Sequence, residues 1–426
     1  MNIIDYIDWR GDLLLNTVPL NEVDVLIFSW LAYYDYGKLM RAGVDIVGLS
    51  LNEIVDQHVK CIGQFQKVNL TTNIIPSVTA TWLLYCAGMS NRFASCRIEA
   101  FEEVLDNERN IQFAALSILY DDKRIVSYRG TDTSIAGWKE DCQLSYSDTV
   151  PSQLLALEFM NKRCDGVKTV LCGHSKGGNL AVYTILHVSE ENLKSIEAVY
   201  NFDGPGFCTE LLNMDRYLQL KGTIITIVPE SSIIGMLLEH EEDYLVIESN
   251  MPSILQHDAF FWKVKGSGFV YLNDRSMTSM VVDQALQEWL KGISLSERRE
   301  FVDMAFGIIE NAGISDITDL TENSIGKVVK ILSGMTTLSS QQRKMIVRLL
   351  LDLLKASNSA LYDTLTGRGI LKEAVDGLTV GSNYIAGIVD KGKNKILTTL
   401  AQGLGRKDST RLIDTNRHDG SPKADK

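Results

Sequence analysis

The stretch TVLCGHSKGGNLAVYTIL, residues 169–186, decides the fold class of this chain. It is entered by KTVLCG at 168–173, a short apolar run with strand character, and it continues into NLAVYTILHV at 179–188, which has helical character. Between the two stands GHSKG at 173–177. A G-x-S-x-G pattern at a strand-to-helix turn is typical of a nucleophilic serine, here Ser175, although a structural serine in a glycine-rich turn has the same local sequence.

Gly173 and Gly177 favour the nucleophile interpretation. Glycine has no Cβ, so a strand and a helix can approach each other closely at such a turn. The helix that follows directs its free N–H groups and the positive end of its dipole at the site. The flanking elements therefore predict that Ser175 stands exposed on a strained turn.

Strand-like and helical segments alternate on both sides of this turn. Such alternation indicates a parallel sheet with helices on both faces, so the predicted fold class is α/β, with a mostly parallel sheet covered by helices. The expected strands lie at 111–120, 124–130, 168–173, 196–206, 222–230 and 243–249, the last residues of some being turns, and the expected helices at 152–164 and 179–188.

The chain of 426 residues is too long for one ordinary domain. We expect an α/β domain over 1–290 with a helical N-terminal part, in which 23–36 is a buried helix. A helical C-terminal region over 291–402 follows, and a polar tail over 403–426 is expected to be disordered. The C-terminal region contains predicted helices at 296–313 and 339–357, which could pack on the first domain, form an oligomer or bind a partner.

Composition excludes several classes of protein. The net charge of −12 argues against nucleic-acid binding and against electrostatic docking on anionic lipid. The seven cysteines are scattered and show no zinc-ligand spacing, so we expect reduced, mostly buried thiols. The N-terminus lacks the basic start and apolar run of a signal peptide, and no segment is apolar enough to span a bilayer. We expect a soluble, cytoplasmic protein.

A nucleophilic serine needs a base, and the predicted topology places it after the serine in the chain. His187 lies 12 residues along the helix, roughly 18 Å away at 1.5 Å per residue. His240 lies in LEHEED, which indicates a solvated surface, and His418 lies in the tail. His174 is adjacent to Ser175 and is expected to orient its neighbours. His257, which follows the last short strand, is the predicted base; the alternative is a partly buried loop histidine. The sixth histidine, His58, precedes the serine.

Two carboxylates could orient His257. Asp203 in NFDGPG follows the strand after the turn, and Glu230 in IVPESS follows the next strand. We prefer Glu230, because the acid of an α/β-hydrolase usually follows the second of these strands and glutamate is a permitted triad acid. Asp203 remains open, since an aspartate before Gly-Pro-Gly can simply cap a turn.

Acyl transfer also needs hydrogen-bond donors for the developing oxyanion. The backbone N–H of Lys176 is one, and Thr131 in the loop SYRGTDTSIAGWKED at 127–141 can offer both its N–H and its hydroxyl. The Lys176 side chain is expected at the surface or paired with a loop. The loop over 131–150 and the N-terminal helices could cover an apolar acyl pocket, or could belong to the core.

At these residues the chain resembles known families. YRGTD, GWKED and GHSKGGNLA are similar to the pattern of class 3 lipases. More closely, GHSKGGNLA, FDGPGF, VPESSIIGMLL and QHDAFFWKV resemble the Mbeg1-like branch of bacterial α/β-hydrolases over roughly 1–280. The resemblance implies an α/β-hydrolase fold and lipase or esterase activity. It implies Ser175 as nucleophile, His257 as base, and Thr131 with Lys176 as oxyanion hole.

The chain departs from the class 3 pattern where those lipases place an aspartate, because PESSIIGML has serines there and Glu230 is the nearest carboxylate. The expected function is a cofactor-independent serine hydrolase that acts on a small-molecule or lipid carboxylic ester through an acyl-enzyme. Two alternatives remain open: a catalytically inert binding or scaffold protein with this fold, and an acyltransferase.

Overall fold

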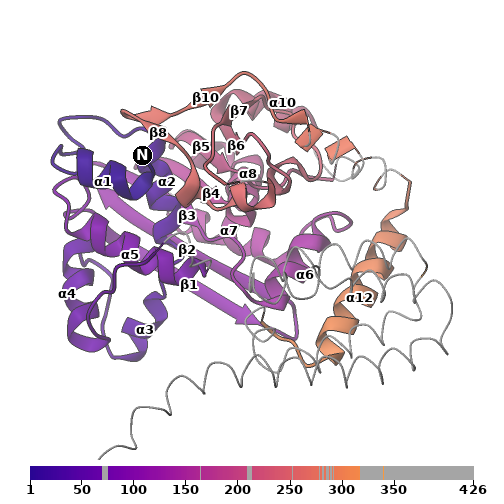
Figure 1. Cartoon of the computed structure of the whole chain (residues 1–426), viewed down its shortest axis with the longest axis horizontal. Helices are drawn as coiled ribbons and strands as arrows, with labels where there is room; N and C mark the ends of the chain where they lie inside the picture. Colours follow the sequence, from indigo (N-terminus) through magenta and orange to yellow (C-terminus); the bar gives the residue numbers. More distant parts are fainter. Residues whose placement is uncertain are drawn as a thin grey trace, which may run out of the picture. The chain divides into compact units, whose positions relative to one another are not determined.

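Figure 1 shows a computed structural model of the chain. It describes residues 1–69, 75–163, 165–208, 214–251, 253–277, 279–280, 283–284, 287, 290, 292–316 and 339. The chain divides into two compact units, Met1–Glu322 and Asn323–Lys426. The predicted helix at 339–357 and the tail at 403–426 lie almost entirely outside the described residues. The account below concerns the first unit.

The first unit is built on an eight-stranded sheet whose strands lie side by side in chain order. The neighbours from β3 to β7 are parallel, whereas β1, β2 and β10 pair antiparallel with their neighbours. The strands are β1 (Arg97–Asp106), β2 (Ile111–Tyr120), β3 (Lys123–Tyr128), β4 (Lys168–His174), β5 (Ile196–Phe202), β6 (Ile224–Pro229), β7 (Tyr244–Ile247) and β10 (Tyr271–Leu272); β8 (Val264–Lys265) and β9 (Gly268–Phe269) form a separate pair.

The N-terminal helices cover one face of the sheet (Figure 1). They are α1 (Ile3–Arg10), α2 (Glu22–Leu31), α3 (Tyr36–Arg41), α4 (Leu51–Cys61) and α5 (Pro76–Gly88). Helix α2 is buried along almost its whole length, starts at an Asn21 capping box and lies against β3 and β4. The predicted buried helix is therefore confirmed. Because side chains from these helices and the sheet share one apolar core, the N-terminal part is a layer of the fold.

The opposite face carries α7 (Pro151–Asn161), α8 (Lys176–His187) and α10 (Met214–Leu220), with a second apolar core that includes Phe159, Leu180 and Tyr217. The crossover from β3 to β4 holds α6 (Ile135–Gln143) as well as α7. A short α9 (Glu190–Leu193) precedes β5. A mostly parallel sheet between two helical layers, with a serine turn after a central strand, is an α/β-hydrolase fold, as expected.

Two elements differ from the sequence-based expectation. β1 lies in a region where mainly helices were expected, because its run RIEAFEEVLD is rich in residues that favour helices and only pairing with β2 makes it a strand. α6 lies in a segment read as a loop, because Gly137 and the polar residues around it weaken the helical pattern. Helix α12 (Leu295–Asn311) confirms the helix expected at 296–313.

Helix α12 packs on α6 within the first unit, although the sequence placed it in a separate C-terminal region. Lys139 on α6 forms an ion pair with Glu310 at 3.2 Å, and the buried Arg298 donates to the backbone oxygen of Ser145 at 2.7 Å. This helix therefore contacts the segment that follows the predicted oxyanion loop.

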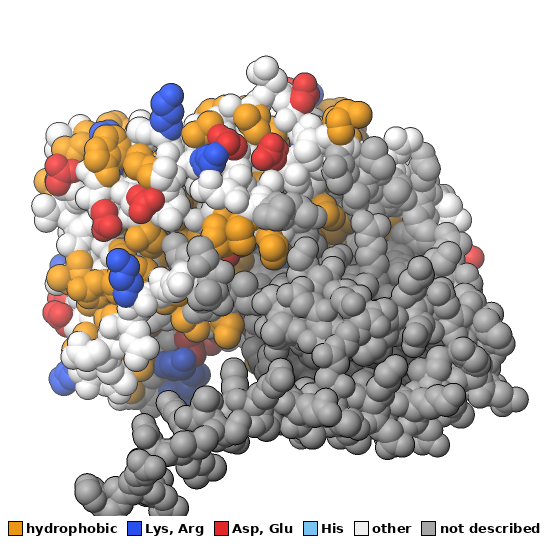
Figure 2. Space-filling model, in the orientation of Figure 1, with side chains coloured by type: hydrophobic (Ala, Val, Ile, Leu, Met, Phe, Trp, Pro, Cys, Tyr) orange, Lys and Arg blue, Asp and Glu red, His pale blue; other side chains and the backbone are white. Residues whose placement is uncertain are grey.

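In the coloured part of Figure 2, acidic and basic side chains stand among apolar and polar ones. In the part of the chain that is described, no helix combines the length and apolar character that crossing a bilayer requires.

Candidate active site

Ser175 occupies a strained turn between β4 and α8. Its backbone has φ +59° and ψ −133°, a conformation that residues other than glycine rarely adopt. A Cβ on Gly173 would lie 2.1 Å from the backbone carbon of Gly177, and one on Gly177 would lie 2.0 Å from the Tyr128 oxygen. Both glycines are therefore required by close backbone approach, as the sequence indicated.

Ser175 is buried, whereas the sequence predicted that it stands exposed. It is 8% exposed, and among the described residues no side chain or backbone group accepts or donates a hydrogen bond at its Oγ. Its backbone N–H is held by the Phe202 oxygen at 2.9 Å. The turn thus fixes the backbone and leaves the hydroxyl available.

His257 pairs with Asp203. The Nδ1 of His257 lies 2.6 Å from Oδ2 of Asp203, whose side chain is fully buried. The His257 side chain is 25% exposed. Because a carboxylate accepts at Nδ1, the neutral ring carries its proton there and keeps the lone pair of Nε2 for another proton.

Strand register explains why Asp203 is near Ser175. His174 of β4 pairs with Phe202 of β5, so the next residues, Ser175 and Asp203, leave the sheet side by side. Phe202 pairs in turn with Ile227 of β6. Glu230 comes three residues after Ile227 and lies beyond the end of a strand that is two removed from Ser175.

Glu230 continues toward β7 instead. Its backbone N–H donates to the Ile247 oxygen at 2.9 Å, and its carbonyl accepts from the Ser276 N–H at 2.7 Å. Its carboxylate forms no hydrogen bond or ion pair with any residue of the described ranges. The structure therefore does not contain the preferred contact between Glu230 and His257. His257 instead contacts the alternative carboxylate, Asp203.

The segment that carries Glu230 still contacts Asp203. Ser232 donates from Oγ to Oδ1 of Asp203 at 2.5 Å, and the Ser279 hydroxyl holds the Ser232 oxygen at 2.6 Å. A Cβ on Gly235 would come within 2.2 Å of the same carboxylate oxygen. Both oxygens of Asp203 thus have partners, and one of the serines in the segment where class 3 lipases place an aspartate bonds a carboxylate that follows the neighbouring strand.

His174 orients neighbouring groups, as expected. Its Nε2 lies 2.7 Å from the His257 backbone oxygen, so it must be the protonated nitrogen, and its Nδ1 lies 3.3 Å from the Tyr33 hydroxyl. Burial, reinforced by the nearby His257, holds the pKa of His174 well below its usual value. A neutral His174 therefore holds the loop that carries His257.

Thr131 stands beside the serine turn. A Cβ on the preceding Gly130 would lie 3.0 Å from Cβ of Ser175, so the loop begins in direct contact with the turn. The Thr131 hydroxyl donates to Oδ2 of Asp141 at 2.6 Å. Burial raises the pKa of Asp141 to about 6, although Lys176 and the Thr131 hydrogen bond lower it.

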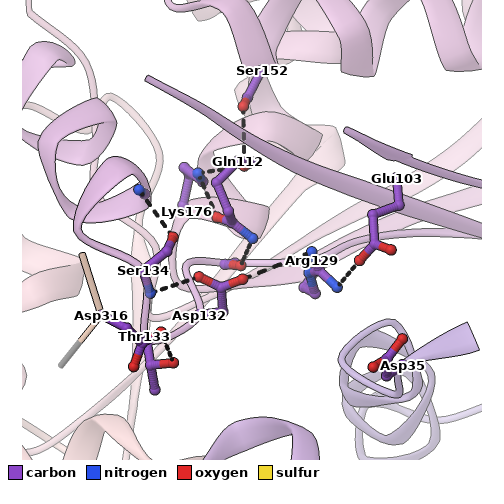
Figure 3. A network of polar contacts seen from close by, with 12 residues as sticks. Asp35, Glu103, Gln112, Arg129, Asp132, Thr133, Ser134, Ser152, Lys176 and Asp316 are labelled. Atoms are coloured by element: carbon purple, nitrogen blue, oxygen red, sulfur yellow. Dashed lines mark hydrogen bonds and ion pairs between the residues drawn. The ribbon is translucent and has the colours of Figure 1, made fainter. Parts of the chain in front are cut away.

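The side chain of Lys176 is fully buried, so the expectation of a surface position is wrong; its ion pair with Glu140, in the segment read as a loop, fits the other alternative. Its Nζ donates to the Gln112 backbone oxygen at 2.7 Å, to Oε1 of Gln112 at 2.8 Å and to Oε2 of Glu140 at 2.9 Å. Glu140 also accepts from the backbone N–H and the hydroxyl of Ser152. Figure 3 shows part of this network. A desolvated ion pair requires such complete pairing, which local sequence does not reveal.

The remaining histidines lie in other surroundings. His187 is exposed on α8 and its Nδ1 bonds the Tyr183 oxygen, while His58 is buried against the Tyr34 hydroxyl. The interpretation of His240 as part of a solvated surface is wrong, because its side chain is 6% exposed and pairs with the buried Glu242. His418 is outside the described residues.

Two residues of the site were not assigned a role from the sequence. Ser232 lies in the VPESSIIGMLL motif, but its contact with Asp203 depends on the approach of another strand, which the motif does not reveal. Asp141 closes the GWKED motif, which was noted as part of the class 3 pattern and could have identified it as the partner of Thr131. Across the described ranges, no group of three or more histidine, cysteine or acidic side chains is arranged to hold a metal ion.

Comparisons with known proteins add the family. A search of solved structures finds a crystal structure of M37 lipase with 14% identity and a TM-score of 0.32, covering 63% of this chain and 79% of that chain. A comparison with curated protein sequences found no significant match. A family model described as Mbeg1-like matches residues 87–307, just over half of the chain, and so begins and ends later than the resemblance over 1–280. With the sheet and the serine turn inside that match, the chain belongs to the Mbeg1-like family.

Proposed function

We propose that this protein is a lipase-like or esterase-like serine hydrolase that cleaves carboxylic esters. The observation that carries the proposal is the Asp203–His257 pair, which lies beside the strained turn of Ser175. The ring of His257 lies 4.6 Å from that of His174, the residue directly before the serine. The proposed nucleophile and acid thus follow the neighbouring strands β4 and β5, and a later loop brings the proposed base to the acid.

The reaction would begin with attack of Ser175 Oγ on the ester carbonyl while Nε2 of His257 takes the hydroxyl proton. Asp203 stabilises the imidazolium through Nδ1–H. The tetrahedral intermediate then collapses, His257 gives its proton to the leaving alkoxide, and the alcohol departs. Water attacks the acyl-enzyme by the same steps, which releases the carboxylic acid and restores Ser175.

The developing oxyanion would rest on backbone N–H groups of Lys176 and Thr131. Lys176 is the first residue of α8, so its N–H has no partner within the helix. The Thr131 hydroxyl has one hydrogen, which it gives to Asp141. We therefore assign the N–H of Thr131 to the oxyanion and treat its hydroxyl as the anchor of the loop.

We propose Asp203 as the triad acid in place of the preferred Glu230. Ser232 supports this role, because its donated hydrogen bond leaves Oδ2 of Asp203 for His257. A carboxylate with both oxygens directed in this way keeps the imidazole in one orientation.

A fluorophosphonate probe tests the nucleophile directly. The wild-type chain, Ser175→Ala and the control Ser189→Ala, which alters an exposed cap of α9, are treated and read by intact mass. We expect one adduct on the wild-type chain and on the control, and none on Ser175→Ala. Hydrolysis rates on a panel of esters then identify the preferred acyl chain. If the protein is an acyltransferase, an added alcohol should take the acyl group in place of water.

Failure of labelling would have a definite meaning. If the folded wild-type chain takes no probe even when detergent micelles or lipid vesicles are present to open a covered site, the hydrolase proposal is wrong. The alternative of an inert binding or scaffold protein with this fold would then stand.

A further inference from the structure

The chain that follows α12 returns to the loop that carries Thr131. The backbone N–H of Ile135 donates to the Ser315 oxygen at 2.9 Å, and Ser134 and Asp316 form an isolated antiparallel bridge. The Thr133 hydroxyl donates to Oδ2 of Asp316 at 2.7 Å, across 183 positions of sequence. Figure 3 shows Asp316 beside Thr133. A distant segment thus binds the loop through backbone and side chain.

We call residues 130–134 the oxyanion loop and residues 314–316 the strap. The start of the oxyanion loop is held from the sheet, where Nε2 of Gln112 donates to the Gly130 oxygen at 3.4 Å. Its middle is held by Asp132, which accepts from the Ser134 N–H at 2.9 Å. Its end is held by the strap. Figure 3 shows these contacts in one view.

The strap is itself fixed in place by α12. Glu310, on the last turns of that helix, forms the ion pair with Lys139 of α6, and Arg298, on its first turns, bonds the Ser145 oxygen. Ile314 is 2% exposed, so the strap begins with a buried apolar anchor. Helix α6 is therefore held by α12 on its side and by the strap at its first residue.

If the first turn of α6 moved, Thr131, which packs against it, would move as well. The N–H of Gly137 in that turn is capped by the Ser134 hydroxyl at 3.2 Å. A Cβ on Gly137 would lie 2.8 Å from Cγ2 of Thr131. Thr131 thus packs against a turn whose position depends on the strap.

We propose that the strap positions the oxyanion loop for catalysis, with Asp316 as a positioning residue. This inference rests on the proposed function. Oxyanion donors act only when held within tenths of an ångström of the developing charge, so an anchor two residues from Thr131 affects the rate. The family match ends at residue 307, so the proposal assigns an active-site role to the segment just beyond it.

The test uses the full chain and two pairs of variants. Asp316→Ala removes the acceptor, whereas Asp316→Asn keeps one; Thr133→Val removes the donor, whereas Thr133→Ser keeps it. Glu300→Ala, which removes an exposed carboxylate from α12, is the control. The measurements are kcat and KM on a short-chain p-nitrophenyl ester, the rate of fluorophosphonate labelling, and Tm.

We expect Asp316→Ala and Thr133→Val to lower kcat and the labelling rate about 10-fold, less than the roughly 10²–10³-fold effect of losing an oxyanion donor. KM and Tm should stay near the wild-type values, and Asp316→Asn and Thr133→Ser should recover most of the rate. The double variant Thr133→Val/Asp316→Ala should be no slower than Asp316→Ala alone, because both changes remove the hydrogen bond between Thr133 and Asp316.

Three outcomes overturn the strap proposal alone: wild-type rates in Asp316→Ala, additive losses in the double variant, or a loss of rate that only follows a lower Tm. A wild-type chain that neither takes the probe nor hydrolyses the ester overturns the proposed function, and this inference with it.

Discussion

At the scale of single residues, the choice between Asp203 and Glu230 depends on strand register. Both follow a strand of the parallel sheet, and both could reach a histidine on a later loop. Asp203 leaves β5 directly beside Ser175, in a backbone conformation with φ +52° that is unusual for an aspartate. Ser232 then takes the second oxygen of its carboxylate. The contacts of Asp203 therefore come from more than one strand connection, and its position beside Ser175 follows from the pairing of β4 with β5.

Exchanging each carboxylate for its amide separates the two candidates. Asp203→Asn should lower kcat by as much as about 10⁴-fold, the loss seen when a triad aspartate becomes an amide and the histidine is left in the wrong tautomer. Glu230→Gln should stay within about twofold of the wild-type rate, since no described residue bonds its carboxylate. Steady-state hydrolysis of an ester that the wild-type chain accepts measures both. If Glu230→Gln lost most of its kcat while Asp203→Asn stayed active, Glu230 would be the triad acid.

At the scale of elements, the junction of β4 and α8 combines a tight turn with a buried ion pair. Lys176 is the first residue of α8, and its side chain reaches Gln112 on β2 and Glu140 on α6. Ser152 at the start of α7 completes the pairing of Glu140. The residue whose N–H is proposed to bind the oxyanion thereby ties four elements together beneath the site. A buried pair of this kind contributes little net stability but is costly to break.

Removing one partner of this pair should destabilise the fold. Lys176→Met leaves Glu140 charged and desolvated, and we expect about 3–5 kcal/mol less free energy of unfolding, measured in urea. Lys176→Met/Glu140→Gln should recover much of that loss, because glutamine can still accept from Ser152 without a buried charge. A cost below about 1 kcal/mol in the single variant would show that water reaches the pair.

At the scale of the whole molecule, His174 connects the two halves of the fold. Its ring lies 5.1 Å from that of Trp30 on α2, in the N-terminal layer, and 4.6 Å from that of His257 in the late loop. Its backbone belongs to the last residue of β4. Because the ring is buried and neutral, its protonation is coupled to the folding of the whole unit.

Stability should therefore fall as pH falls below about 6.5. The pKa of His174 is depressed in the folded protein, so below 6.5 the unfolded chain binds a proton that the folded chain does not. That difference makes the free energy of unfolding decrease with acidification by roughly 1.4 kcal/mol per pH unit until the folded pKa is reached. Urea unfolding between pH 5 and 8 measures the slope. His174→Gln should have a shallower slope, and an unchanged slope would contradict the argument.

The sequence by itself determined the elements around Ser175, because short-range sterics govern them. The two glycines, the apolar strand before the serine and the helix after it all follow from local pattern, and they predicted the α/β fold. The sequence also singled out His257 as the predicted base, since few histidines follow the serine. Tertiary structure alone decided the partner of His257, the burial of Lys176, the strand character of β1 and the contact of Asp316 with Thr133. Each of these joins residues far apart in the chain, so each depends on strand register, desolvation and packing that no local window of sequence contains.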